Sequence, residues 1–204
     1  MQDMKAGKRF RVNYCKFYVK KNWQILFFAI LYISGLMIGV CFLYLSSQET
    51  LNLLQQISEA FLNSRLKGKG GEIFTASYLS IFWCIGAIFL LGRVHGGKWL
   101  TLMLIWFRGL GSGLSMAGIY YGNGWDALPF MAGVVTPVVF CQAMLLFWSA
   151  KTVWRYQEAV VSAKPGQGSE QHIIRAYWLI FLLMLALSAV PAGLDTVLSA
   201  CWSK

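Results

Sequence analysis

Charged residues are scarce in this chain of 204 residues, at 13%, and the acidic ones are scarcest, with 8 Asp and Glu against 18 Lys and Arg. Soluble domains carry about 25% charged residues. Hydrophobic residues make up 57% of the chain and aromatic residues 16%, and the mean hydropathy is +0.56. A soluble domain of this size could not bury so much apolar surface, so we expect an integral membrane protein.

Motifs of catalysis and metal binding are missing as well. The sequence has no glycine-rich phosphate loop, no His-Glu-x-x-His motif, no carboxylates paired at helical spacing and no neighbouring Ser, His and Asp set. Its five cysteines form no Cys-x-x-Cys pair. We therefore expect no catalytic residues, no metal and no cofactor, and an enzyme is the least expected class of protein.

The net charge of +10 could suggest a nucleic-acid partner if the basic residues formed one stripe. They cluster instead at the ends of long apolar runs, as in proteins whose basic residues set their orientation in a membrane. We expect the lipid bilayer as a partner and no nucleic acid.

The apolar runs predict an all-α fold in which a basic cytoplasmic tail, 1–22, precedes a single transmembrane domain, 23–204. A helix of about 20 apolar residues spans a hydrocarbon core of about 30 Å. The first run is expected to be an uncleaved anchor, because no small-residue cleavage site follows it. Five transmembrane helices are expected, near 23–46, 75–91, 99–121, 127–150 and 177–201.

Segment 47–74 separates the first two of these runs and is predicted to be a short amphipathic helix followed by a turn. Leu51, Leu54, Ile57 and Leu62 recur in it at helical spacing.

The orientation follows from the basic residues that flank the expected spans, because the cytoplasmic side of a membrane protein holds the excess. Alternating spans place thirteen Lys and Arg on the side of the N-terminus and four on the other side. This bias predicts a cytoplasmic N-terminus, an extracytoplasmic segment 47–74 and an extracytoplasmic C-terminus.

Arg108 falls nine residues into the third expected helix, near the middle of the bilayer, where a charge costs about 3 to more than 10 kcal/mol. It needs a partner or a water-filled recess. Asp195, the one acid inside an apolar run, could pair with it across a depth difference of roughly 10 Å. Alternatively, Arg108 bonds backbone carbonyls freed around Pro137, lines a polar cavity used for transport, or only orders the bundle.

Small residues form stripes on two of the expected helices. Gly109 and Gly113 lie on one face of the third helix, and Gly35 and Gly39 lie on one face of the first. Such stripes let backbones approach closely in lipid, and they favour packing within the chain over a dimer interface. Pro137 predicts a kink in the fourth helix.

The layout resembles the stage II sporulation protein M family, bacterial membrane proteins of about this length, over nearly the whole chain. The most specific part is the segment from Trp83 to Gly86, followed by Arg108-Gly109 and its small-residue ladder, which resembles the family's basic-Gly-x-x-x-Gly helix. A lysine is more usual in that family where this chain has Arg108.

Other positions also match the family. Thr136-Pro137 resembles its proline in helix four, Asp195 takes the place of an acid in the last helix, and Gly35 and Gly39 fit as well. The chain departs from the family in lacking the Pro-Gln-Asn triplet that is often found at this proline.

The resemblance implies a role in endospore formation, during which the mother-cell membrane migrates around the forespore. It implies a non-catalytic scaffold for peptidoglycan-degrading hydrolases, in the bacterial cell membrane and at the septal membrane of the mother cell. A permease subunit that binds an anionic solute at Arg108 is the alternative. The lack of a visible internal repeat favours the scaffold.

Overall fold

The structure is a computed structural model that describes residues 2–67, 69–94, 96–162 and 169–202, and every regular element in these ranges is helical. The all-α fold class is therefore confirmed for the described residues. The α-helices are α1 (Gln2–Leu45), α2 (Gln48–Lys67), α3 (Gly70–Gly92), α4 (Gly97–Asn123), α5 (Leu128–Phe130), α6 (Thr136–Ser162), α7 (Ser169–Leu187) and α8 (Ala189–Trp202).

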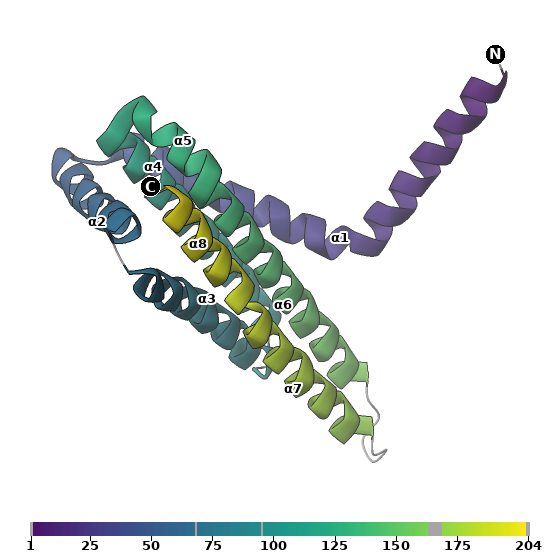
Figure 1. Ribbon diagram of the computed structural model, residues 1–204. Helices are drawn as coiled ribbons and strands as arrows, with labels where there is room; N and C mark the ends of the chain where they lie inside the picture. The colour runs from purple at the N-terminus through teal and green to yellow at the C-terminus, as the bar shows by residue number, and fades with distance from the viewer. Residues whose placement is uncertain (1, 68, 95, 163–168, 203–204) are drawn as a thin grey trace.

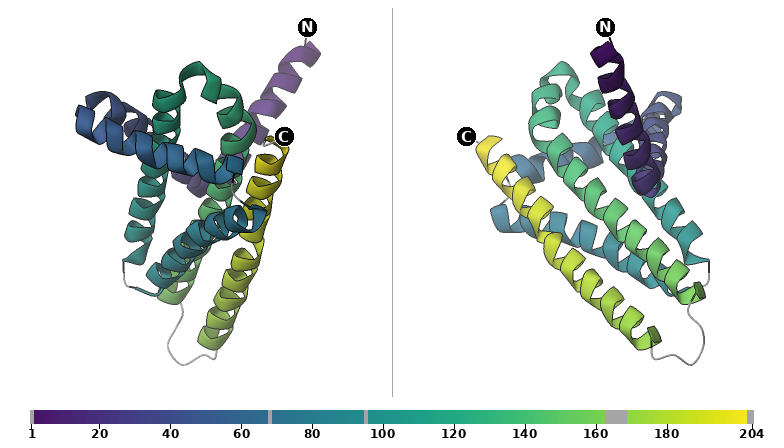
Figure 2. Two further views of the ribbon diagram at one scale, coloured as in Figure 1. Left: turned by 60° about the vertical axis from the view of Figure 1, so that its left-hand side comes forward. Right: turned by 90° about the vertical axis from the view of Figure 1, so that its right-hand side faces the viewer.

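Four helical stretches are long and apolar enough to cross a membrane: Trp23–Leu43, Gly70–Gly92, Gly97–Val161 and Ile174–Trp202. The third stretch has 65 residues, which as a straight helix would measure about 100 Å, three times the hydrocarbon core. Figure 2 shows that the chain turns back after α4, so that α4 and α6 form two legs side by side. The 3-10 turn η1 (Gly124–Ala127), α5 and the π-helical turn η2 (Met131–Val135) make the reversal.

Helix α1 runs without a break from the basic segment into the first apolar run. The sequence predicts a boundary between a tail and a helix near residue 22, but the chain is helical on both sides of it. No proline lies between residues 2 and 45, so nothing in the covalent chain stops the helix there. Figure 1 shows that the helix changes direction between its two halves.

The core of the bundle is built by α1, α4 and α6 together. Phe28 and Tyr32 of α1 are buried against Ile105 of α4 and Phe147 of α6. The rings of Tyr32 and Phe147 meet edge to face, with 5.8 Å between their centroids. A second cluster joins α3, α6 and α7 around Phe89. Aromatic side chains therefore fill the space between helices whose outer faces are apolar and exposed.

Helix α2 crosses α4 near the end that leads into η1 (Figure 2, left). The predicted amphipathic helix is present, and Leu51 and Ser58 are buried on its bundle side. Ile57 belongs to the predicted apolar stripe, but 66% of its surface is exposed. Because an α-helix has 3.6 residues per turn, positions 51 and 58 lie on the same face, which is the one toward the bundle. Position 57 then points away from the bundle.

The helical segment that runs from α5 through η2 into α6 changes its helical pitch just before Pro137. The backbone N–H and the hydroxyl of Thr136 both donate to the carbonyl of Met131, the hydroxyl at 2.8 Å, which closes a wider π-helical turn. Pro137 has no N–H to donate, so the carbonyl four residues earlier loses its usual partner. The distortion that the proline predicts is therefore a π-helical turn directly before it.

The last predicted span, 177–201, consists of two helices that meet at Ser188. Pro191 follows in the first turn of α8, where a missing N–H costs least. The hydroxyl of Ser188 donates to the carbonyl of Leu185 at 2.6 Å. The break at Ser188 was not among the sequence expectations, although Pro191 could have indicated it.

Candidate functional site

A polar cavity of about 430 Å³ lies within the bundle, between α2, α3, α4, α6 and α8. Its apolar lining includes three valines from η2 and α6, together with apolar side chains of α2, α3 and α4. The charged and amide residues that line it are Arg65, Arg108, Gln142 and Asp195, and the serines are Ser64, Ser77, Ser80, Ser112 and Ser115.

Arg65 and Asp195 form an ion pair at one side of this cavity. The Nε and Nη2 atoms of Arg65 donate to the two carboxylate oxygens of Asp195, at 3.1 and 2.6 Å. The side chain of Asp195 is only 2% exposed and that of Arg65 is 15% exposed. The guanidinium also stacks on the ring of Phe61, 3.6 Å from its centroid. The pair links α2 to α8 by a bidentate contact. A lysine could not make this contact, because it lacks the planar guanidinium group.

Arg108 reaches the same cavity from α4 and has a neutral partner. Its Nη2 donates to Oε1 of Gln142 on α6 at 2.9 Å. Gln142 in turn donates through Nε2 to the hydroxyl of Ser77 on α3, at 3.4 Å. The question that the sequence leaves open is thus answered: Asp195 bonds Arg65, and no carboxylate of the described residues lies within ion-pair distance of Arg108.

A second chain of hydrogen bonds holds the backbone of α4 at Arg108. The hydroxyl of Ser112 donates to the carbonyl of Arg108 at 2.9 Å. Tyr32 of α1 lies 2.8 Å from the same hydroxyl and supplies the proton that Ser112 accepts. Arg108 is therefore held in place from α1 as well as from α6.

The four candidate glycines meet in one seam between α1 and α4. A Cβ atom on Gly35 or Gly39 would collide with the carbonyl oxygen of Trp106 or Leu110. A Cβ atom on Gly109 or Gly113 would collide with the carbonyl oxygens of the facing turns of α1, at Tyr32 and Leu36. Each stripe therefore packs on the backbone of the other helix, as close packing of small residues allows.

Sequence reasoning missed three residues of the site. None of the three is among the expected site residues: Arg65 lies in the segment 47–74 that is predicted to be amphipathic and extracytoplasmic, and Ser77 and Gln142 lie in two of the expected transmembrane helices. The signal for Arg65 was its spacing, since it continues the bundle-side stripe of α2 from Ser58 by seven residues. Helical spacing gave no comparable signal for Ser77 or Gln142.

Comparison with models of protein families, with curated proteins and with solved structures gives no match for this chain. The resemblance to the sporulation family rests on the sequence motifs named above. Among the described residues, no three His, Cys, Asp or Glu side chains gather closely enough to hold a metal ion.

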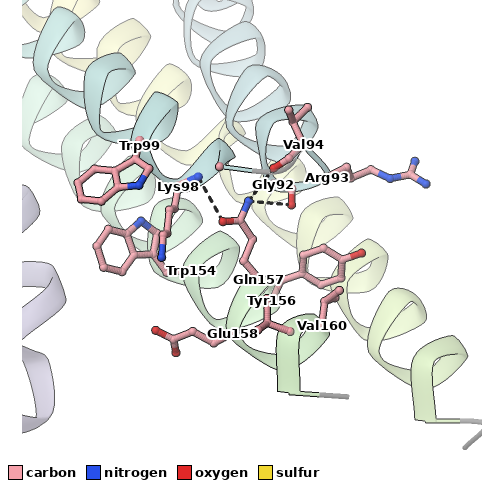
Figure 3. Close-up of a pocket in the computed structure, with 12 residues that line it drawn as sticks. Gly92, Arg93, Val94, Lys98, Trp99, Trp154, Tyr156, Gln157, Glu158 and Val160 are labelled. Atoms are coloured by element: carbon pink, nitrogen blue, oxygen red, sulfur yellow. Dashed lines mark hydrogen bonds between the residues drawn. The ribbon is translucent and has the colours of Figure 1, made fainter. Parts of the chain in front are cut away.

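A second hollow, of about 570 Å³, lies at the other end of the bundle, where the turn between α3 and α4 meets the last turns of α6. Figure 3 shows that Gln157 of α6 points at this turn. Its Nε2 donates to the carbonyls of Gly92 and Val94, at 3.2 and 3.1 Å, and its Oε1 accepts from the backbone N–H of Lys98 at 3.3 Å. Gln157 thus bonds three backbone groups of the turn, of which the Val94 carbonyl also accepts the N–H of Gly97, at 2.9 Å.

Proposed function

We propose that this protein is a five-span membrane scaffold for septal peptidoglycan hydrolases, needed for septum migration and forespore engulfment during sporulation. The two legs α4 and α6 supply the third and fourth spans, because each alone is long enough to cross a bilayer. The N-terminus is cytoplasmic and α2 is extracytoplasmic, in accord with thirteen basic residues against four. A hydrolase that acts on the cell wall works outside the cell membrane, so the scaffold must contact it on the extracytoplasmic side.

The observation that carries this proposal is the attachment of α2 to the bundle. The Arg65–Asp195 pair holds one end of α2, and Ser58 packs against Gly118 of α4 further along. The opposite face of α2 is open, with Leu53 60% and Ile57 66% exposed four residues apart. Two apolar side chains one turn apart on a fixed helix make a docking surface for a partner protein.

The first experiment is to delete the gene in its native host and to score engulfment with a membrane dye after the polar septum has formed. A septum that stays flat or bulges supports the scaffold and justifies recovering wall hydrolases with the protein. Normal engulfment, in a host with no second copy of the gene, overturns it.

A second experiment tests the face of α2. The deletion strain is complemented with a Leu53→Glu, Ile57→Glu variant, or with a control that carries Asn52→Glu and Gln56→Glu on the same exposed side. Both variants add two carboxylates four residues apart, and only the first removes the apolar pair. We expect the first to accumulate normally but fail in engulfment and hydrolase recovery, and the control to complement. Equal complementation by both excludes this face as the docking surface.

The second candidate function is a permease subunit, and the polar cavity with Arg108 is the observation that favours it. Arg108→Lys separates the two functions, because lysine keeps the charge and loses the planar fork. The scaffold tolerates this change as long as the protein folds. A permease keeps its protein level and loses uptake of its anionic solute.

A further inference from the structure

Arg108 carries a charge that no described side chain cancels. Along α4 it lies about 17 Å from Gly97 and about 22 Å from Asn123, far from both ends of the leg. Asp195 is the one carboxylate in the cavity lining, and both of its oxygens are occupied by Arg65. Two arginines against one aspartate leave the cavity with one positive charge in excess.

The hydrogen-bond partner of Arg108 does not remove this excess. The amide oxygen of Gln142 takes one of the five guanidinium N–H groups and contributes a dipole but no negative charge. A guanidinium near mid-bilayer costs several kcal/mol unless an opposite charge or a polar recess stabilises it. The cavity supplies the recess, and an anion inside it would supply the charge.

Hydroxyl groups of α3 line the same cavity as the guanidinium. Ser77 is buried and accepts a hydrogen bond from Gln142, so its own proton remains free for another acceptor. Ser80, one turn further along α3, lines the cavity and makes no hydrogen bond to a described residue. A planar cation with two serine hydroxyls matches an oxyanion with several acceptor oxygens.

We propose that this cavity binds a phosphate group, with the guanidinium of Arg108 on two of its oxygens and the hydroxyls of Ser77 and Ser80 as further donors. A volume of about 430 Å³ lies within the range of small-ligand sites, about 300 to 1,000 Å³, and exceeds the needs of a bare ion. The phosphate can belong to an anionic lipid headgroup or to a free solute. The inference does not depend on the scaffold proposal.

The test measures binding to the full-length chain purified in detergent. Phosphatidylglycerol is compared with diacylglycerol, which lacks the phosphate group, in mixed micelles, and sodium phosphate with sodium chloride at equal ionic strength. The readouts are the midpoint of thermal unfolding and the lipid retained in native mass spectrometry. We expect Arg108→Gln to weaken binding by about tenfold or more, because it removes a charged donor pair, whereas Arg155→Gln, at an exposed arginine outside the cavity, leaves it unchanged.

The outcomes identify the source of the phosphate. A response to phosphatidylglycerol alone assigns the site to a lipid headgroup, and a response to inorganic phosphate assigns it to a solute. No response of the unaltered protein to either probe overturns the proposal, as does equal binding by the protein with Arg108→Gln. If that variant does not fold, Ser77→Ala with Ser80→Ala keeps the charge and removes both hydroxyls. Unchanged binding by this second variant also overturns the proposed site.

Discussion

Arg65 and Asp195 stand 130 positions apart in the chain and share two hydrogen bonds, at 3.1 and 2.6 Å. Through this pair the amphipathic helix between the first two apolar runs is joined to the last helix of the chain. The pair also forms one side of the polar cavity that holds Arg108. Helix α2, the buried Asp195 and Arg108 thus belong to one connected site.

Removing the carboxylate should destabilise the bundle more than removing both charges. Asp195→Ala leaves the guanidinium of Arg65 largely buried without a counter-charge, at a cost of about 3 kcal/mol, whereas Arg65→Ala with Asp195→Ala should recover part of that loss. Thermal unfolding in detergent measures the difference, with Asp126→Asn at an exposed position as the control. A double variant less stable than Asp195→Ala would show that the two side chains do not act as a pair.

Enlarging a glycine in the seam between α1 and α4 should separate these two helices. Gly109→Ala and Gly35→Ala each place a methyl group against a backbone carbonyl that cannot move aside, and we expect a loss of about 1–3 kcal/mol from either change. Gly111→Ala is the control on the same helix, because its Cβ would meet nothing within 4 Å. The unfolding midpoint and the yield of monodisperse protein report the outcome. Alanine favours a helix over glycine, so Gly111→Ala should be neutral or stabilising; a loss at 111 as large as the loss at 109 would contradict the packing role of the seam.

The clamp formed by Gln157 should depend on its two donated hydrogen bonds. Gln157→Glu replaces the NH₂ group with a second acceptor, so the carbonyl of Gly92 loses its bond from Nε2 and the carbonyl of Val94 keeps only its bond from the N–H of Gly97. We expect a loss of about 1–3 kcal/mol, the cost of leaving a buried polar group unpaired. Gln56→Glu makes the same chemical change at an exposed position of α2. Equal stability of the two variants in thermal unfolding would contradict the assigned role.

The proposed orientation can be tested with single cysteines in a chain whose own cysteines are replaced by serine. A cysteine in place of Glu59, on the exposed side of α2, should react with a membrane-impermeant maleimide in intact cells. A cysteine in place of Glu158, near the end of α6, should react only after the cells are opened. The reverse pattern would show that the N-terminus is extracytoplasmic.

Local pattern was sufficient to predict the all-α class and the amphipathic character of α2. The glycine stripes were predicted because their spacing of four residues places them on one helical face. Which stripe packs on which helix was not predictable, since the same spacing lets a face of small residues approach any of the other helices. The pairing of the two stripes therefore depends on how α1 and α4 cross in the folded bundle.

Composition and near-neighbour spacing are enough to predict that the chain is helical, apolar enough for a membrane and rich in basic residues at the ends of its apolar runs. The pairing of Asp195 with Arg65, and the hydrogen bonds that run from Arg108 through Gln142 to Ser77, are visible only in the folded bundle. Those partners come from helices far apart in the chain. The rotation and depth of each helix are set by side-chain packing across the whole bundle, and no single helix contains that information.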